Sequence, residues 1–389
     1  MTSTVTVLRA PSSNRVYASR SGPLAVAEAH WVLGAHLGAP VPVREHTVGG
    51  MDALRVEGVE LTAPRGVSTD HAPEDHTGAD APALRLLASL SSTLGLLEDV
   101  AGTAHGEARG GAGRLLRPLD PPPVLRHPSD LETILKYPGK TNEQFTALLV
   151  NLAAALSTRR AGLFDGTLTL LDPLCGRGTT LNRALRLGLS PLGAEIDRKD
   201  VDAYRAFLAT WLRTHRYKHT VTDGRLTRHG KQLGIRIDAE LAPDKQAQRE
   251  GRGQTLTVYG CDTRELAHLL PARSVDAIVG DLPYGVQHGG RSAAGWQRSP
   301  LEVLAEAAPG WRSLLRAGGG MALAVNLRTL AHDDATAVLA EAGLRVISPD
   351  GAFRHRVDQS IDRDVLLAIP TDHPQAEQLA ALGTHERTP

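Results

Sequence analysis

Short apolar segments alternate with segments of helical periodicity through the second half of the chain. The apolar segments have the length of buried strands and lie at residues 167–173, 191–196, 254–260, 275–281, 321–326, 344–349 and 365–370. Apolar residues with helical spacing lie at 142–156, 180–187, 201–214, 301–316 and 331–342. Strands separated by helices of this length predict an α/β fold with a doubly wound, mostly parallel sheet. The last two strands are joined by only about a dozen polar residues, which favours an antiparallel pair.

The first 130 residues have a different pattern. Strand-like segments lie at 5–11, 14–20, 41–48 and 51–61, and helical spacing is found at 23–37 and 82–100. Two stretches rich in Gly, Pro, Asp and Thr, 62–82 and 101–114, indicate a loop and a connector, and a Pro-rich boundary follows at 120–123. We therefore predict a small α+β domain with its linker over 1–130, a larger α/β domain over 131–370 and a flexible tail over 371–389.

Charge is unevenly distributed, although the chain as a whole is neutral. Lys+Arg and Asp+Glu each number 43, which excludes a uniformly basic nucleic-acid coat. Residues 198–236 nevertheless hold ten Lys and Arg against three Asp, with Trp211 and Tyr217 among them. This stretch opens an insertion at about 198–255 and is a candidate for contact with phosphates. A solvated helix face and loop is the alternative interpretation.

The remaining composition narrows the class of protein. Two cysteines, Cys175 and Cys261, exclude a disulfide framework and a cysteine-based zinc site, and the histidines lack the spacing of metal ligands. We expect no metal. No apolar stretch is long enough to span a bilayer, and residues 1–15 lack the apolar core of a signal peptide. A cytoplasmic protein without a membrane partner is therefore the expectation.

A glycine-containing turn follows the strand at 167–173. Gly176 and Gly178 permit a sharp turn and a close approach of a ligand, and the helix that starts near Thr179 presents free N–H groups. The third glycine of the dinucleotide-binding pattern is absent, because Leu181 stands at its position. Glu195 ends the next strand, 19 residues after Gly176, where an acid can accept hydrogen bonds from ribose hydroxyls.

Two further strands end in acidic residues. Asp262 follows the strand at 254–260, where it either binds an exocyclic amine of a base or caps the next helix. Asp281 ends the strand at 275–281 and is followed by Leu282, Pro283 and Tyr284. A carboxylate, a turn stiffened by proline and an aromatic ring suit recognition of a planar amine at the carboxyl edge of a parallel sheet. A turn with a buried tyrosine is the structural alternative.

Taken together, LDPLCGRGTT (171–180), GAEID (193–197), YGCD (259–262) and DLPYG (281–285) resemble class I S-adenosylmethionine-dependent methyltransferases. They are most similar to the branch whose (D/N)-P-P-(Y/F) motif methylates exocyclic amines of nucleic-acid bases. The Asp-x-Pro-Tyr-Gly form resembles the tRNA guanine-N2 methyltransferases and their THUMP-domain relatives. The segment 136–156 resembles the helix that precedes the catalytic domain there. The resemblance covers about residues 136–370 and implies a class I Rossmann-like sheet, with the first 130 residues as an RNA-binding region.

The resemblance also implies roles for individual residues. The motif around the methionine part of S-adenosylmethionine falls on Asp172, Cys175, Gly176, Gly178 and Thr179. The acid that binds ribose falls on Glu195, where aspartate is more usual, and the acid that binds adenine falls on Asp262. The catalytic motif, whose first residue also adjoins the cofactor, falls on Asp281, Leu282, Pro283 and Tyr284. Leu282 replaces the commoner proline, which points toward guanine-N2 enzymes.

The sequence thus predicts an S-adenosylmethionine-dependent enzyme that methylates an exocyclic amine of a base, with guanine N2 of tRNA as the leading substrate. Within the same class, a DNA adenine or cytosine amino-methyltransferase and a methyltransferase for a small molecule or a protein remain open. From another class, a non-catalytic protein that binds RNA or the cofactor also remains open.

Overall fold

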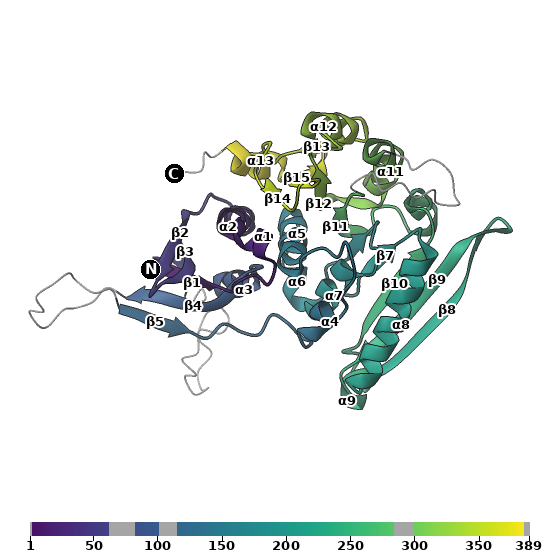
Figure 1. The fold of residues 1–389 in the computed structure, drawn as a ribbon, viewed down its shortest axis with the longest axis horizontal. Helices are drawn as coiled ribbons and strands as arrows, with labels where there is room; N and C mark the ends of the chain where they lie inside the picture. Colours follow the sequence, from purple (N-terminus) through teal and green to yellow (C-terminus); the bar gives the residue numbers. More distant parts are fainter. Residues whose placement is uncertain (1, 62–81, 101–114, 284–298, 385–389) are drawn as a thin grey trace, which may run out of the picture. The chain divides into compact units, whose positions relative to one another are not determined.

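The computed structural model describes residues 2–61, 82–100, 115–283 and 299–384. The chain forms two compact units, Met1–Val124 and Leu125–Pro389, each built on its own sheet (Figure 1).

The described part of the first unit is an antiparallel sheet with three helices. Its strands run in the order β2-β3-β1-β4-β5. The strands are β1 (Thr2–Arg9), β2 (Val43–Val48), β3 (Met51–Glu60), β4 (Thr93–Val100) and β5 (Leu115–Leu119). The helices are α1 (Arg15–Ala18), α2 (Ser21–Leu37) and α3 (Pro82–Ser89). Trp31 and Leu33 of α2 are buried, so this unit has a hydrophobic core of its own.

Two predictions for the first unit are wrong. Residues 14–20 are not a strand, because the Asn14 side chain accepts hydrogen bonds from the backbone N–H groups of Val16 and Tyr17 and starts α1. The helix expected over 82–100 ends at Ser89. Ser91 then donates its backbone N–H to the buried carboxylate of Glu28, and the chain continues as β4 beside β1. A local helix cap decides the first segment and tertiary partners decide the second, in both cases against the periodicity of the sequence.

The second unit contains a mixed sheet in the order β13-β15-β12-β11-β6-β7-β10-β9-β8, with β14 paired to β15. Its strands are β6 (Leu170–Asp172), β7 (Leu192–Ala194), β8 (Lys218–Arg228), β9 (Lys231–Ala242), β10 (Gln254–Gly260), β11 (Val275–Asp281), β12 (Leu315–Asn326), β13 (Leu344–Val346), β14 (His355–Arg356) and β15 (Asp362–Pro370). The strands from β12 to β10 are parallel, and β15 is antiparallel to β12. The predicted doubly wound α/β sheet is confirmed, as is its antiparallel final pair.

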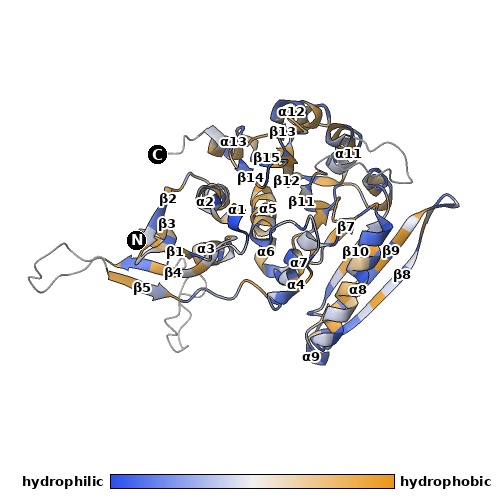
Figure 2. Cartoon of the chain, in the orientation of Figure 1, coloured by the Kyte–Doolittle hydropathy of each residue, from blue (hydrophilic) through white to orange (hydrophobic). Residues whose placement is uncertain are grey.

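Helices cover both faces of this sheet. They are α4 (Asp130–Thr133), α5 (Glu143–Leu156), α6 (Gly162–Asp165), α7 (Thr179–Arg186), α8 (Arg198–Thr214), α9 (Lys245–Arg249), α10 (Leu266–Leu269), α11 (Pro300–Leu314), α12 (His332–Glu341) and α13 (Ala376–Thr384), with a 3₁₀ turn, η1, at Thr263–Glu265. The helices α7 and α8 pack on one face, and α10, α11 and α12 pack on the other. Hydrophobic residues are concentrated in β11, β12 and α5 (Figure 2).

Two segments of the second unit differ from the sequence prediction. The predicted insertion contains an unpredicted hairpin, β8–β9, which extends the sheet beyond β10 (Figure 1). The tail was expected to be flexible from residue 371, but α13 forms there and buries Leu379 and Leu382. These two leucines are three residues apart, so they lie on one face of the helix and fix it to the unit.

Candidate functional site

The turn between β6 and α7 brings backbone N–H groups to the carboxyl edge of the sheet. Gly176 and Gly178 have φ angles of 50° and 79°, a region that side chains with a Cβ rarely adopt. A Cβ on Gly178 would collide with the ring of Tyr204, which is 1% exposed and cannot move away. Glycine is therefore required at position 178 by both the backbone conformation and the packing, and the turn leads directly into α7.

Asp172 ends β6 directly below this turn. Its Oδ1 accepts a hydrogen bond from the backbone N–H of Leu174 at 3.0 Å, and its side chain is also bonded to Thr180. Burial raises the pKa of Asp172 to about 7, against the hydrogen bonds, which act in the opposite direction. The carboxyl group is thus fixed in orientation and changes charge close to neutral pH.

Glu195, one strand away at the end of β7, is bound to the glycine turn. Its two oxygens accept hydrogen bonds from the backbone N–H of Gly176, at 2.9 Å, and of Asp197, at 2.7 Å. Burial also raises the pKa of the Glu195 carboxyl group. The two predicted cofactor-binding segments, the glycine turn and the acid after β7, are therefore in direct contact.

Asp281 ends β11 on the other side of β6, and two side chains hold its carboxylate. Thr141 donates its hydroxyl to Oδ2 at 2.6 Å, and Nη2 of Arg363 lies 3.8 Å from the same oxygen. The Arg363 side chain is only 6% exposed, and its guanidinium lies 4.7 Å from the ring centroid of the buried Phe145. A hydroxyl donor and a buried cation beside the carboxylate restrict its position.

The residues after Asp281 are placed by β12. Leu282 is 1% exposed, and its backbone N–H donates to the carbonyl of Ala324 at 3.0 Å, so the peptide cannot rotate freely. Pro283 follows and lines the same cavity as Asp281. Tyr284, the aromatic residue of the predicted catalytic motif, lies outside the described residues.

Asp262 lies at the same edge of the sheet but is engaged locally. Its carboxylate accepts a hydrogen bond from the backbone N–H of Arg264 at 3.0 Å and forms an ion pair with the Arg264 guanidinium at 2.6 Å. It caps η1 and does not line the cavity beside Gly176. The structure shows Asp262 as a helix cap, and its assignment as the acid that binds adenine stays a prediction.

A cavity of about 280 Å³ connects the glycine turn to Asp281. Its lining includes seven predicted site residues: Asp172, Cys175, Gly176, Thr179, Asp281, Leu282 and Pro283. Gly178 and Glu195 stand behind this lining, the first as the N-cap residue of α7 and the second bound to Gly176. Segments at the ends of three strands, β6, β7 and β11, therefore meet at one rim of the sheet.

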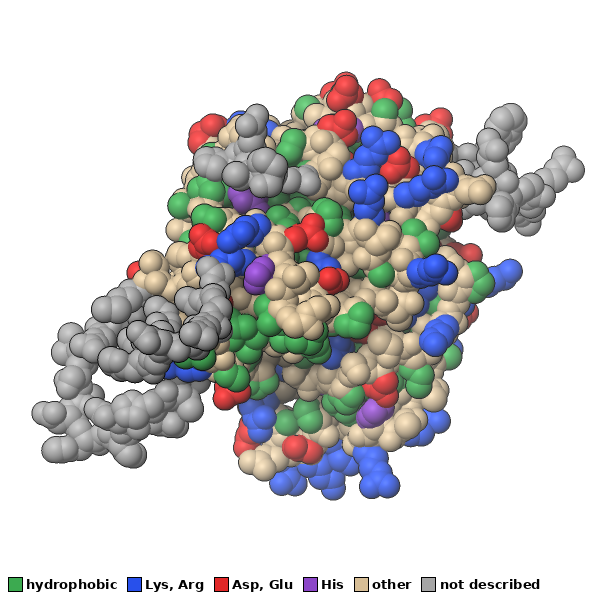
Figure 3. Space-filling view, turned by 60° about the vertical axis from the view of Figure 1, so that its left-hand side comes forward, with side chains coloured by type: hydrophobic (Ala, Val, Ile, Leu, Met, Phe, Trp, Pro, Cys, Tyr) green, Lys and Arg blue, Asp and Glu red, His purple; other side chains and the backbone are tan. Residues whose placement is uncertain are grey.

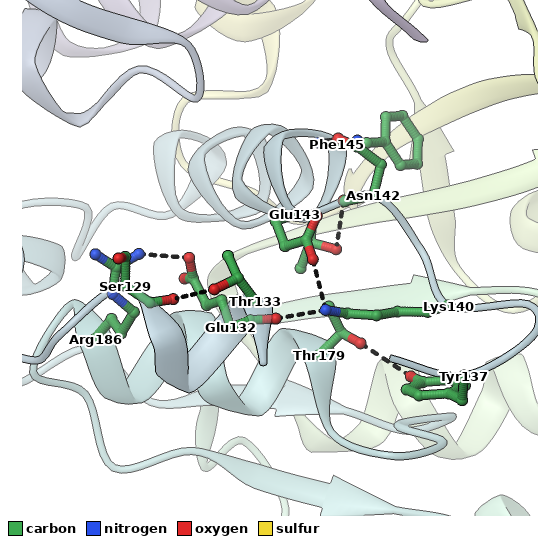
Figure 4. A network of polar contacts seen from close by, with 11 residues as sticks. Ser129, Glu132, Thr133, Tyr137, Lys140, Asn142, Glu143, Phe145, Thr179 and Arg186 are labelled. Atoms are coloured by element: carbon green, nitrogen blue, oxygen red, sulfur yellow. Dashed lines mark hydrogen bonds and ion pairs between the residues drawn. The ribbon is translucent and has the colours of Figure 1, made fainter. Parts of the chain in front are cut away.

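The segment 136–142, just before α5, also lines the cavity, and no role in the site was predicted for it. Tyr137 shares a hydrogen bond of 3.1 Å with Thr179, and the Arg177 guanidinium lies 4.8 Å from the Tyr137 ring centroid. Lys140 donates to the backbone carbonyl of Glu132 and to the side chain of Glu143 (Figure 4). The likeness of this segment to the helix region before known catalytic domains was its only signal in the sequence.

The charges around the cavity suit a cationic ligand. Among the described residues, its lining contains the carboxylates Asp172, Asp200 and Asp281 and one cationic side chain, Arg177, which is paired to Asp200 at 2.7 Å. Such a surplus of carboxylates attracts a sulfonium and an ammonium group. The hydrogen-bonding acid Glu195, one strand away, suits ribose hydroxyls. The residues present therefore fit S-adenosylmethionine.

Neither a metal cluster nor a membrane-spanning helix is found in the part of the chain that the structure describes. No group of three or more His, Cys, Asp or Glu is arranged there to hold a metal ion. No helix there is both long enough and apolar enough to cross a membrane.

Residues 139–298 match the model of a family described as RMKL-like, methyltransferase domain. This range contains the glycine turn, Glu195, Asp262 and the Asp281 turn. The second unit therefore contains a class I methyltransferase domain, and the protein is an enzyme with S-adenosylmethionine as its expected cofactor. The resemblance recognised from the sequence is confirmed at this level.

Comparison with solved structures gives several similar chains. TrmN from Thermus thermophilus is 14% identical with a TM-score of 0.39, covering 95% of this chain and 100% of its own. The rRNA methyltransferase aviRa from Streptomyces viridochromogenes is 16% identical with a TM-score of 0.36, covering 63% and 93%. A TehB-like methyltransferase from Corynebacterium glutamicum is 15% identical with a TM-score of 0.28, covering 54% and 86%. No match was found among curated proteins.

The raised pKa of Asp172 predicts that cofactor binding depends on pH. A bound cation favours the carboxylate, so binding at pH 6 must first remove a proton that is already absent at pH 8. With a pKa of about 7, we expect the affinity for S-adenosylmethionine to rise about tenfold between pH 6 and pH 8. Isothermal titration calorimetry at the two pH values measures this, and Asp172→Asn removes the dependence. Equal affinity of the wild-type protein at both pH values would contradict it.

The raised pKa of Asp172 makes the stability of the cofactor-free protein fall as the pH rises, whereas the cofactor affinity increases. The folded chain retains the Asp172 proton up to about pH 7, whereas the unfolded chain releases it near the ordinary value of 3.8. The resulting stabilisation is complete below pH 3.8 and is lost as the pH rises toward 7. Bound cofactor is therefore expected to raise the melting temperature more at pH 8 than at pH 6.

Proposed function

We propose that the protein transfers a methyl group from S-adenosylmethionine to an exocyclic amine of an RNA base, with guanine N2 of tRNA as the substrate. The observation that supports this best is the position of Asp281, whose carboxylate lines the same cavity as the glycine turn and Asp172. The Asp-x-Pro-Tyr-Gly form of the segment that begins there resembles enzymes that methylate guanine N2. The first unit is proposed as an RNA-binding region.

The residues around Asp281 suit the activation of an amine. An exocyclic amine is a weak nucleophile because its lone pair is delocalised into the base. Hydrogen bonds from its N–H groups to the Asp281 carboxylate and the Leu282 carbonyl favour a nitrogen whose lone pair is available. Thr141 and Arg363 hold the carboxylate in place, so orientation is established before the reaction.

The bound cofactor supplies an electrophilic methyl group on a sulfonium. One C–N bond forms as the C–S bond breaks, leaving S-adenosylhomocysteine and a methylated amine with one proton in excess. Asp281 is placed to accept that proton. Tyr284 is assigned, from the motif alone, to stack on a base that has been removed from its neighbours.

The substrate class is tested with labelled cofactor. The protein is incubated with total RNA and, separately, with duplex DNA, and each product is digested and analysed by mass spectrometry. We expect label in N2-methylguanosine from the RNA and none in the DNA. Label in N6-methyladenine or N4-methylcytosine of DNA would replace this proposal by the DNA alternative. Absence of label from both polymers would exclude nucleic acid as the substrate.

A further inference from the structure

The tip of the β8–β9 hairpin lies at the same edge of the sheet as the cofactor cavity. Ile235 of β9 pairs with Gly260, the last residue of β10, and also with Arg225 of β8. Residues 226–234 therefore extend beyond the carboxyl end of β10, and Figure 1 shows the hairpin as a long arm that passes β10. Because β10 is parallel to β7, β6 and β11, this is the edge that carries Glu195 and Asp281.

The tip is a tight turn that carries positive charge. His229 and Gly230 form its two-residue turn with φ angles of 48° and 75°, the combination of a type I′ turn that matches the twist of the flanking strands. Residues 224–236 contain Arg225, Arg228, Lys231 and Arg236, together with His229, and no acidic residue. A tight turn holds these side chains at a defined place and avoids the ordering cost of a long loop.

Among the described residues, two of the four Lys and Arg side chains of the tip are paired with carboxylates, and the other two are not. Arg228 lies 3.8 Å from Glu265, and Arg236 lies 2.8 Å from Asp238. Arg225 and Lys231 are exposed, and neither forms an ion pair with any residue that the structure describes. They are available to an anionic partner from outside the chain.

The charges that line the cavity favour such a separate contact for an RNA substrate. The carboxylates that suit the cationic cofactor repel phosphates. On the other side of Asp281, Arg354 is engaged by Asp362 at 2.6 Å. In the order β11-β6-β7-β10-β9-β8, five strand spacings separate Asp281 from β8, which is roughly 24 Å at about 4.8 Å each. A polynucleotide crosses this distance with several nucleotides.

Three other cations of the basic stretch, Arg213, Arg216 and Lys218, are at the opposite edge. Lys218 pairs with Ala242, next to the amino end of β10, and Arg213 and Arg216 lie just before it. Along β8 this is roughly 33 Å from the tip, at about 3.3 Å per residue. Lys and Arg side chains also gather at the bottom of Figure 3, the height at which α9 lies in Figure 1. The cations of the hairpin tip and those at the end of α8 are therefore two separate clusters, and of these two the tip faces the side of the sheet where the reaction is proposed.

We propose that Arg225 and Lys231 at the β8–β9 tip bind backbone phosphates of the RNA substrate, several nucleotides away from the base at Asp281. This inference rests on the proposed function for its partner. It assigns no such role to the cluster around Lys218, although that cluster belongs to the same basic stretch.

The test compares two double variants with equal loss of charge. Arg225→Gln/Lys231→Gln removes the tip cations, and Arg213→Gln/Lys218→Gln removes two at the opposite edge. Binding of fluorescently labelled bulk tRNA is measured by anisotropy between 50 and 200 mM salt, and binding of S-adenosylmethionine is measured as a check of folding. We expect the tip variant to lose about tenfold in RNA affinity and to reduce the slope of log K against log salt by about 1.4–1.8, since each phosphate contact contributes about 0.7–0.9.

We expect the opposite-edge variant to retain the wild-type affinity and slope, and both variants to bind the cofactor normally. Equal losses in the two variants, or no loss in the tip variant, would overturn the inference. If the wild-type protein binds tRNA through the tip but methylates no RNA, the proposed function is refuted while the role of the tip in binding is retained. If the tip variant binds and methylates RNA like the wild type, the proposed function is retained, but the proposal that Arg225 and Lys231 bind phosphates is refuted.

Discussion

Replacing Asp281 by asparagine lowers kcat for methyl transfer by about 10²–10⁴-fold while the affinity for S-adenosylmethionine changes by less than about tenfold. Asparagine keeps the size of the side chain but removes the negative charge and the ability to accept the proton released by the amine. The cofactor retains Asp172, the glycine turn and Glu195, which lie on β6 and β7. Single-turnover transfer and equilibrium cofactor binding separate the two effects.

Thr141→Val provides the graded comparison for this prediction. It removes the 2.6 Å hydrogen bond to Oδ2 but leaves the carboxylate and its contact with Arg363. A lost hydrogen bond of this kind is worth about 1 kcal/mol, so we expect a fall in kcat of about tenfold or less. Transfer by Asp281→Asn at the wild-type rate would refute the assignment of Asp281, and a larger loss in Thr141→Val would assign the main role to the hydroxyl.

Replacing Gly178 by alanine abolishes measurable cofactor binding and destabilises the second unit by about 2–5 kcal/mol. The φ of 79° costs a residue with a Cβ about 1–2 kcal/mol. Overpacking against the buried Tyr204 ring adds about 1–3 kcal/mol. The turn must shift to relieve the collision, which moves the backbone that contacts Glu195. Thermal unfolding and cofactor titration measure the two results.

Gly251→Ala is the matched control for this change. Gly251 has a φ of 70°, but nothing lies within 4 Å of a Cβ added there. We expect only the backbone cost of about 1–2 kcal/mol and unchanged cofactor affinity. If Gly178→Ala bound the cofactor normally, the glycine turn would not hold it in the way described.

The site residues on strand ends were predictable because the rule that places them is local. Asp172, Glu195 and Asp281 each end an apolar segment, and parallel strands bring their carboxyl ends to one edge. The glycine turn was equally readable, because the positive φ angles of Gly176 and Gly178 restrict the residue types allowed there. The strand order of the sheet brings these residues, which are separate in the sequence, together around one cavity.

The partners that hold the site residues were not predictable in the same way. Thr141 and Arg363 reach Asp281 from distant parts of the chain. Apart from the family likeness of the segment that contains Thr141, nothing in the sequence marks them as its partners. Arg264, which engages Asp262, is two residues away and could have been weighed from the sequence. Residue spacing predicts which side chains end a strand, but tertiary packing determines what each of them contacts.

The hairpin β8–β9 shows a related limit. Its residues are largely polar on the exposed edge strand, so the apolar alternation that marks buried strands is weak there. The charge of the stretch was evident from the sequence, but the separation of the cations at the hairpin tip from those around Lys218 depends on the register of β8 with β9. Only the folded chain distinguishes the cations near the cavity from those at the far edge.

The most direct measurement is a crystal structure of the protein with S-adenosylhomocysteine. The account predicts the ligand in the cavity between the Gly176 turn and Asp281, with its ribose hydroxyls on Glu195 and its sulfur directed toward the Asp281 carboxylate. A ligand bound elsewhere, or bound in the cavity with its sulfur directed away from Asp281, would contradict the account.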